Sequence, residues 1–271
     1  MPIRKRRLGR TNLEIAELGL GAMDTPTSPD GFATVTAALD LGIDFVDTAR
    51  DYGGSEFLLA NVIRSRGGKA FAISSKTFKR TSDGAQWDVD RSLKVLGVDF
   101  IDVYHLHDVR TYEDWAQVKG TNGALAGLKT AQYRGLIGHI ALSTHELEIG
   151  REAIVSGGFG AVMLEYSAFY TASAPLLELA ADRDVGVIVM RPLGGSGRTS
   201  VMRTRLERGD AGVLTPQNLL RYVLSNSAVS VAIPGARFPD RVRDNVATAL
   251  TAEPMAGDEM GALESAAAAL Y

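Results

Sequence analysis

The chain has 271 residues, of which 45% are hydrophobic and 23% charged, and its formal net charge is −3 at pH 7. Interspersed charges of this balance argue against nucleic acid or an anionic membrane as partner, and the lack of cysteine excludes disulfides, thiolate nucleophiles and cysteine-bound iron–sulfur clusters. Without an apolar leader or a run of 18 apolar residues, we expect a soluble cytoplasmic protein that is a monomer or a weak homo-oligomer.

Short apolar runs alternate with longer amphipathic stretches along the sequence. The opening segment Leu8–Leu13 has turn chemistry between two apolar pieces, which predicts a β-hairpin. Eight strands are predicted after it, over Leu18–Leu20, Phe45–Asp47, Ala70–Ser74, Ile101–Leu106, His139–Leu142, Ala161–Leu164, Val185–Met190 and Val229–Ile233. Eight helices are predicted near Phe32–Leu41, Ser55–Arg66, Ala85–Leu96, Leu125–Tyr133, Glu146–Ser156, Pro175–Arg183, Pro216–Ser225 and Pro239–Ala249, and a final Ala-rich helix near Met260–Leu270.

This alternation predicts an α/β fold. Parallel neighbours cannot be joined by tight hairpins, so repeated strand–helix units require a parallel sheet with right-handed crossovers. Eight repeats favour a closed (β/α)8 TIM barrel over an open doubly wound sheet. We therefore expect residues 1–271 to form a single TIM-barrel domain, with a short N-terminal β-hairpin capping its bottom and a C-terminal helix on its exterior.

Four residues of complementary chemistry lie near the carboxyl ends of the early strands, where a parallel barrel opens. These residues are Asp47, Tyr52, Lys76 and His107. A phenol, with a reference pKa of about 10, is a weak acid at neutral pH, but an ammonium such as Lys76 stabilises the phenolate. Asp47 would keep Lys76 protonated, and a neutral His107 would orient a carbonyl oxygen. This set donates a proton to a developing alkoxide, and a nicotinamide must supply the hydride.

The pair His105 and His107 permits a second interpretation. Residues i and i+2 of a strand share a face, so the two histidines could ligate a metal as in amidohydrolase-like barrels. A metal site needs further ligands, and the remaining histidines are His139 and His145. We therefore predict no metal site and expect His105 to pack inside the barrel or to support the site residues from behind. A metal-dependent barrel hydrolase is an alternative function.

Several segments resemble the aldo-keto reductase family, and their order and spacing are more specific than any one of them. They are Arg7–Thr11, Leu18–Gly21, Phe45–Ala49, Tyr52-Gly53, Ser55-Glu56, Ile233–Arg237 and Asp244-Asn245. The resemblance implies NADPH-dependent, reversible reduction of an aldehyde or ketone to an alcohol. It also implies the same catalytic residues, Asp47, Tyr52, Lys76 and His107, with Tyr52 as the general acid.

The resemblance further implies cofactor contacts at the later strand ends. Ser143 matches the serine that bonds the nicotinamide carboxamide, whereas Thr144 and Met163 replace a frequent Asn and Gln. Met190 stands where an aromatic residue often stacks on the nicotinamide, and Arg191 is expected near the pyrophosphate. The full predicted set is Ser143, Thr144, Met190, Arg191, Pro192, Leu193, Gly195, Arg237, Arg241, Asp244 and Asn245.

The basic residues after the eighth strand bear on the choice of nucleotide. Arg237 and Arg241 are candidates to bind an adenosine 2′-phosphate, which favours NADPH and leaves NADH as a second cofactor, while Asp244 and Asn245 would bond the adenine edge. A solvated basic helix face is the alternative interpretation of this segment. The expected substrate is a small carbonyl compound, and a slowly turning NADP(H)-sensing interaction protein is a further alternative.

Overall fold

The computed structural model describes residues 2–270, with the side chains of Ser196 and Arg203 left out. Its strands are β1 Lys5–Arg7, β2 Glu14–Ala16, β3 Leu20–Gly21, β4 Phe45–Asp47, β5 Ala72–Thr77, β6 Ile101–Leu106, β7 Ile137–Ser143, β8 Ala161–Glu165, β9 Gly186–Met190 and β10 Val231–Ala232. Its helices are α1 Pro29–Asp40, α2 Ser55–Ser65, α3 Ser82–Leu96, α4 Tyr112–Lys119, α5 Ala124–Tyr133, α6 Leu147–Ser156, α7 Ala174–Asp182, α8 Ser196–Arg208, α9 Pro216–Ser225, α10 Pro239–Thr251 and α11 Gly257–Ala268.

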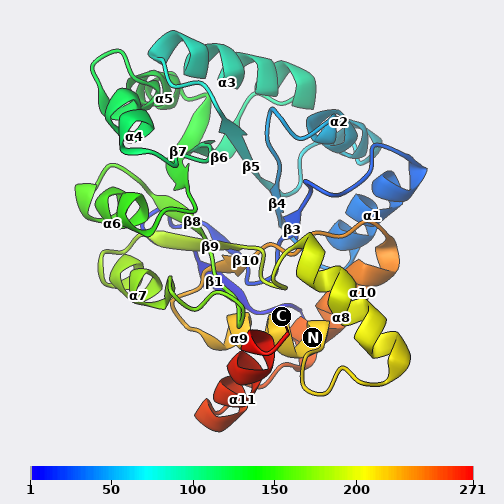
Figure 1. The fold of residues 1–271 in the computed structure, drawn as a ribbon. Coiled ribbons are helices and arrows are strands. Elements are labelled where there is room, and N and C mark those ends of the chain that lie inside the picture. The colour runs from blue at the N-terminus through cyan, green and yellow to red at the C-terminus, as the bar shows by residue number, and fades with distance from the viewer. Residues whose placement is uncertain (1, 271) are drawn as a thin grey trace.

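Within these residues, the eight strands from β3 to β10 form one parallel sheet in chain order. Parallel bridges between Leu18 and Ala232 and between Gly21 and Gly235 join its two edges. The backbone N–H of Gly19 also donates to the Ala232 carbonyl at 2.8 Å. The sheet is therefore a closed barrel with the helices outside it, which confirms the predicted fold class (Figure 1).

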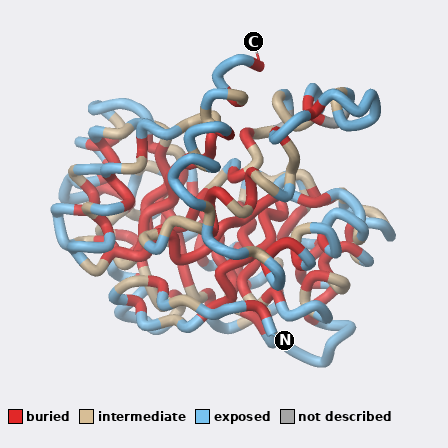
Figure 2. The backbone as a smooth tube through the Cα atoms, turned by 90° about the horizontal axis from the view of Figure 1, so that it is seen from below, coloured by how far each residue is buried: buried red, intermediate tan, exposed pale blue. Residues whose placement is uncertain are grey.

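Apolar side chains fill both sides of the barrel wall because successive residues of a strand point to opposite faces. Large side chains inside the barrel include Phe45, Val103, Met163 and Ile188. A larger apolar cluster lies between the strands and the surrounding helices. Buried backbone is accordingly concentrated in the central strands, and exposed backbone in the outer helices and loops (Figure 2).

The predicted N-terminal hairpin is present, with β1 and β2 antiparallel. Its turn meets the amino end of β9 through a bridge between Gly9 and Val185. Gly9 has a φ of +48°, and a Cβ there would lie 2.1 Å from the Gly186 nitrogen, so this approach requires glycine. Leu8 is fully buried in the interior cluster. The hairpin thus closes the end of the barrel opposite the carboxyl ends of the strands.

Two helices in the described residues, α4 and α8, were missing from the sequence prediction. The α4 helix has eight residues and begins after Thr111, whose Oγ1 accepts from the Asp114 N–H at 3.0 Å. The α8 helix is polar and rich in arginine, with Met202 as its buried apolar side chain, so it lacks a clear apolar period. The predicted C-terminal helix is present as α11, and the Tyr222 hydroxyl on α9 donates to its Glu264 at 2.6 Å.

Several strand bounds also differ from the prediction. Strand β5 extends to Thr77, so Lys76 lies inside this strand rather than after it. Strand β10 is shorter than predicted. None of the helices in the part of the chain that the structure describes is long and apolar enough to cross a membrane.

Candidate active site

Asp47 and Lys76 form a buried ion pair at the carboxyl ends of two adjacent strands. Asp47 ends β4, and the parallel register places it beside Ser74, two residues before Lys76 on β5. Lys76 Nζ donates to Asp47 Oδ2 at 2.5 Å and to the Thr48 carbonyl at 2.7 Å. Burial raises the pKa of Asp47 and lowers the pKa of Lys76, while their mutual attraction opposes both shifts. Lys76 is therefore held in place both by its ion pair with Asp47 and by its hydrogen bond to the Thr48 carbonyl.

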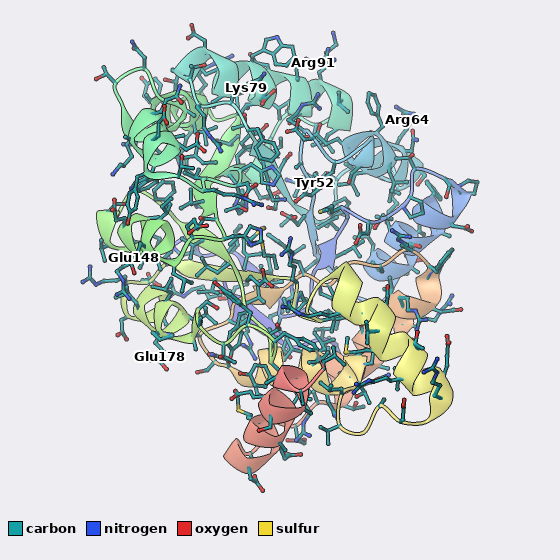
Figure 3. All side chains as sticks on the ribbon, viewed as in Figure 1. Tyr52, Arg64, Lys79, Arg91, Glu148 and Glu178 are labelled. Carbon is teal, nitrogen blue, oxygen red and sulfur yellow. The ribbon has the colours of Figure 1, made fainter. Side chains whose placement is uncertain are left out.

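Tyr52 lies in the turn between β4 and α2, over the lysine. Lys76 Nζ is 4.5 Å from the centroid of the Tyr52 ring. Burial raises the pKa of Tyr52 far above its usual value, and Asp47 and Asp108 raise it further. This net direction is opposite to the lowering expected from Lys76 alone. The phenol therefore keeps its proton at ordinary pH, and Figure 3 shows Tyr52 within the ring of helices.

His107 is the first residue after β6 and is almost completely buried. Its ring packs on Phe78 with 4.0 Å between centroids and meets the Tyr52 ring edge-on at 5.6 Å. Burial, followed by the charges of Lys76 and Arg80, lowers the pKa of His107 to about 3. The imidazole is therefore neutral at physiological pH. The structure thus brings all four predicted catalytic side chains together at the strand ends.

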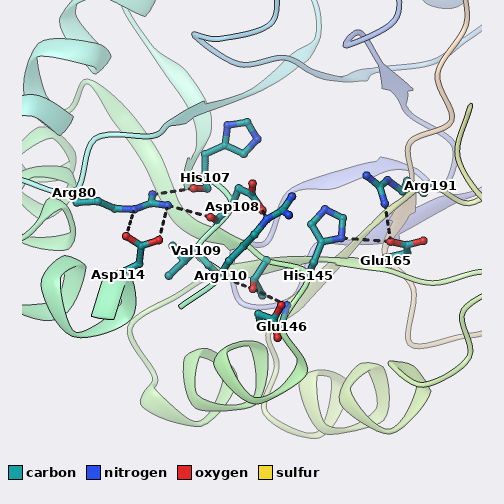
Figure 4. Close-up of polar contacts among 11 residues, drawn as sticks. Arg80, His107, Asp108, Val109, Arg110, Asp114, His145, Glu146, Glu165 and Arg191 are labelled. Carbon is teal, nitrogen blue, oxygen red and sulfur yellow. Dashed lines mark hydrogen bonds and ion pairs between the residues drawn. The ribbon is translucent and has the colours of Figure 1, made fainter. Parts of the chain in front are cut away.

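An arginine that the sequence interpretation missed fixes the backbone at His107. Arg80 follows β5 and donates to the carbonyls of His107 and Asp108, at 2.8 and 3.0 Å. Its Nε lies 3.3 Å from the Asp114 carboxylate. Asp108 has a φ of +53°, so the chain turns sharply here. These contacts are drawn in Figure 4, and no motif around Arg80 indicated them in advance.

His105 lies one inward-facing position deeper on β6 and is fully buried. Its Nε2 is 2.9 Å from the Ser74 hydroxyl. The other two histidines lie apart from it in different settings: His139 is partly buried on β7, and His145 pairs with Glu165. Among residues 2–270, no group of three or more histidine, aspartate and glutamate side chains is arranged to hold a metal ion.

The predicted nicotinamide-side residues lie on the same edge of the barrel. Ser143 ends β7 and is buried, and Met190 ends β9 and is half-buried. Thr144 Oγ1 donates to the Val109 carbonyl at 2.6 Å and accepts from the Glu146 N–H at 3.0 Å. The hydroxyl of Thr144 is therefore engaged in joining the loops that follow β6 and β7.

Glu165, at the end of β8, contacts two arginines and a histidine that the sequence analysis did not connect. Its Oε2 lies 3.1 Å from Arg191 Nη1 and 3.3 Å from His145 Nδ1, and its Oε1 lies 3.8 Å from Arg198 Nη1. Burial alone would raise the pKa of Glu165, but His145 and Arg191 outweigh it and lower the pKa. Figure 4 shows His145 and Arg191 both directed at this carboxylate. Arg191, predicted near the pyrophosphate, is held here.

The glycine-rich segment after Arg191 leads directly into a helix. Pro192 is buried and Leu193 is half-buried. Gly194 and Gly195 have φ values of +86° and +84°, and Gly195 is the residue before α8 begins. These two glycines therefore lead into α8, whose first backbone N–H groups have no partner within the helix.

The predicted adenosine-side residues lie after β10 and on α10. Arg237 and Arg241 are exposed, and Asn245 is half-buried. Arg241 pairs with Asp244 one helical turn away at 3.5 Å, with each side chain about half exposed. Asp244 also lines a groove between α9 and α10. These residues form a group separate from the glutamate-centred cluster of Arg191 and Arg198.

A sequence model described as the aldo/keto reductase family matches residues 17–268. This chain belongs to the aldo/keto reductase family. The family prediction is thus confirmed, and the protein is an NAD(P)H-dependent oxidoreductase.

Relatives agree with this assignment over nearly the whole chain. This aldo-keto reductase is 26% identical to YqkF of Bacillus subtilis strain 168, described as an uncharacterized oxidoreductase, over 97% of this chain and 96% of the relative. A holo-form aldo-keto reductase of Bacillus halodurans superposes with a TM-score of 0.82 at 22% identity, covering 99% of this chain and 98% of that one. An aldo-keto reductase of Klebsiella pneumoniae in complex with NADPH has a TM-score of 0.77 at 21% identity, covering 98% and 95%.

Proposed function

We propose that this aldo-keto reductase reduces a small aldehyde or ketone to the alcohol with NADPH, reversibly, and that Tyr52 is the general acid. The observation that carries the proposal is a neutral phenol over the lysine of a buried Asp47–Lys76 pair, with a neutral imidazole edge-on to the phenol ring. The nicotinamide supplies the hydride when it is bound.

Each of the four residues has a distinct role in handling the proton. Tyr52 retains its proton at neutral pH and gives it to the oxygen of the carbonyl as negative charge develops there. His107 is neutral, so it can donate one hydrogen bond that orients the carbonyl without competing as an acid. Lys76 keeps positive charge close to the ring, and Asp47 holds Lys76 in place.

The polar groups around the strand ends suit an anionic dinucleotide. Arg191 and Arg198 lie beside the N-terminus of α8, and helix N-termini together with arginine side chains favour phosphate. Arg237 and Arg241 are exposed near the start of α10 and would bind the 2′-phosphate of NADPH. The NADPH complex of the Klebsiella relative supports this choice. Ser143 and Met190 would lie beside the nicotinamide.

A turnover assay tests the proposal. Consumption of NADPH is followed optically with a panel of aldehydes, ketones and α-dicarbonyls, and the alcohol product is identified by mass spectrometry. We expect carbonyl-dependent oxidation of NADPH that is faster than with NADH. Tight NADPH binding without turnover of any panel member would instead favour a nucleotide-sensing protein. Product formation that persists in the absence of any nicotinamide would contradict the proposed reduction.

A further inference from the structure

A chain of three polar groups runs behind Lys76 across strands β6, β5 and β4. His105 Nε2 lies 2.9 Å from Ser74 Oγ, and Ser74 Oγ donates to Asp47 Oδ1 at 2.8 Å. The other carboxylate oxygen of Asp47 accepts from Lys76 Nζ at 2.5 Å. Ser74 and His105 are both fully buried. Each oxygen of the Asp47 carboxylate therefore has its own donor, one from Lys76 and one from the serine.

Proton counting fixes the direction of this chain. A serine hydroxyl has one proton, and an ionised carboxylate can only accept. Because Ser74 gives its proton to Asp47, its oxygen must accept from His105, and His105 must carry its proton on Nε2. Nδ1 of His105 makes no hydrogen bond of acceptable geometry among the described residues, although the Leu142 carbonyl lies near the ring, and this fits a ring nitrogen without a proton. A proton on Nδ1 would instead leave Ser74 between two acceptors.

These polar side chains stand out from their surroundings. Around them the barrel interior is filled by apolar residues such as Phe45, Val103 and Ala141. Burying a hydroxyl and an imidazole in such a place is costly unless both are hydrogen-bonded. A role in packing alone would be met by any apolar side chain of similar volume, so the polar chemistry of this pair requires another explanation.

We propose that His105, acting through Ser74, is a positioning residue for the Asp47 carboxylate. The proposal rests on the proposed reductase function. With His105 as donor, the Ser74 proton cannot turn away from Asp47, so Asp47 stays ionised and oriented toward Lys76. Lys76 in turn stays charged beneath the Tyr52 ring. Other titratable groups around this pair are Tyr52, His107 after β6, and Glu56 on α2.

Three substitutions test this role. His105→Leu keeps similar volume and removes the donor, whereas His105→Gln is the matched control because its amide N–H can reach the position of Nε2. Ser74→Ala breaks the chain at its centre. We expect Ser74→Ala to lower kcat by roughly ten- to a hundredfold, the value of one hydrogen bond to a charged group. His105→Leu should lower kcat by roughly two- to tenfold, the value of one neutral hydrogen bond. NADPH affinity should stay unchanged, and His105→Gln should recover most of the lost rate.

The pH profile separates positioning from packing. Ser74→Ala removes a hydrogen bond from Asp47, and His105→Leu weakens that bond because the Ser74 hydroxyl is no longer held by a donor. In both variants the protonation of Asp47 therefore moves to higher pH, further in Ser74→Ala. The low-pH limb of kcat/KM should therefore shift upward in these two variants and not in His105→Gln. Profiles that superimpose on wild type in all three variants, with changes in melting temperature alone, would show that His105 only packs.

Nitrogen NMR of the wild-type protein tests the tautomer without any variant. Nitrogen-15 shifts of the His105 ring should show a protonated Nε2 and an unprotonated Nδ1. The opposite tautomer, with its proton directed toward the nearby Leu142 carbonyl, would overturn the proposal. This measurement also holds if His105→Leu fails to fold. A wild-type protein that shows the Nε2–H tautomer but reduces no carbonyl would refute the proposed function and not the hydrogen-bonded chain.

Discussion

Tyr52 is a buried phenol that lies beside a positive charge, the Lys76 ammonium. Its phenol is neutral over the ordinary pH range, yet it lies on a lysine ammonium that favours the phenolate once a proton is taken. Tyr52→Phe keeps the ring and removes the donor. We expect carbonyl reduction to fall by roughly 10²- to 10⁴-fold, the usual range for a lost general acid.

Steady-state kinetics with an aldehyde whose chemical step limits the rate would measure this loss. NADPH affinity, from cofactor fluorescence, serves as the control and should stay the same because the ring volume is kept. A phenylalanine variant that retains a third or more of the wild-type kcat would exclude Tyr52 as the acid.

The depressed pKa of His107 links folding to pH. Its pKa is about 3 in the folded protein, against an ordinary value of 6.5. Between these values the unfolded chain binds a proton that the folded chain does not. The contribution of His107 to the free energy of unfolding is therefore fully present above pH 6.5. It decreases as the pH falls toward 3, by up to about 1.4 kcal/mol per pH unit.

Urea unfolding of wild type and His107→Asn at pH 7 and pH 4.5 measures this contribution, because the variant lacks the titrating ring. Other groups titrate in both proteins and cancel in the comparison. Wild type should lose more unfolding free energy than the variant over this interval. Equal losses would mean that His107 titrates near its ordinary pKa in the folded protein.

Residue chemistry singled out the four side chains that the structure brings together because each has a distinctive type and follows or ends an apolar run. Ser74 and Arg80 have no such mark. Serine and arginine are common in such segments, and their importance depends on the parallel register that places one beside Asp47 and the other beside the carbonyl of His107. Contacts between residues on different strands are set by the tertiary fold, which local sequence does not encode.

The loop that follows β5 holds the backbone at His107, the proposed substrate-orienting residue. Arg80→Met removes two hydrogen bonds to the carbonyls of His107 and Asp108 and an ion pair with Asp114. We expect a decrease in kcat/KM of roughly tenfold or more, since charged hydrogen bonds contribute about 1.5–3 kcal/mol. Steady-state kinetics and NADPH titration would separate this effect from any loss of cofactor affinity.

Arg110→Met is the matched control for this element. Arg110 bonds the side chain of Asp108 at 2.6 Å but is more than half exposed, and exposed ion pairs contribute little. Its kinetics should remain close to wild type. If Arg80→Met also behaves as wild type, the loop after β5 does not position His107.

At the start of α10, two exposed arginines are expected to select the nucleotide. Arg237→Ala and Arg241→Ala should weaken the binding of NADPH by about ten- to a hundredfold and the binding of NADH far less, because only NADPH carries a 2′-phosphate. The pair between Arg241 and Asp244 is half exposed and therefore leaves Arg241 free to reorient. Cofactor fluorescence titrations with both nucleotides would measure this. Equal losses for NADPH and NADH in both variants would place the 2′-phosphate elsewhere.

Helices with an apolar period were predictable, and helices without one were not. The bounds of α9 agree with prediction because Thr215 caps a helix that starts with proline, and its Oγ1 accepts from the Asn218 N–H at 3.1 Å. The α8 helix follows two glycines and carries mainly polar residues. It has no apolar period, so the pattern that predicted the other helices does not reveal it.

The two ends of the barrel are expected to serve different purposes: the hairpin end contributes to stability, and the carboxyl ends of the strands hold the proposed active site. Leu8 fills the bottom of the interior, far from the strand ends that hold Tyr52. Leu8→Ala should lower the free energy of unfolding by about 2–5 kcal/mol because it leaves a cavity. At low temperature kcat should hardly change, because the substitution leaves the carboxyl ends of the strands, where the site lies, unaltered.

Denaturant unfolding and kinetics on the same samples would check this separation. Leu41→Ala, at an exposed leucine that follows α1, is the control and should cost far less stability. A large drop in kcat for Leu8→Ala at a temperature where the variant is fully folded would show that the hairpin shapes the active site as well.

The seam of the barrel has a consequence for synthesis on the ribosome. Leu18 bridges Ala232, which is 214 residues later in the chain. At about 5–20 residues per second, roughly 10–40 s pass between the translation of these two positions. During this time the growing chain has strand edges with no permanent neighbour, and such edges invite association with other chains. The barrel of this reductase can close only after Ala232 has been translated, which makes the nascent chain a natural client for protection by chaperones.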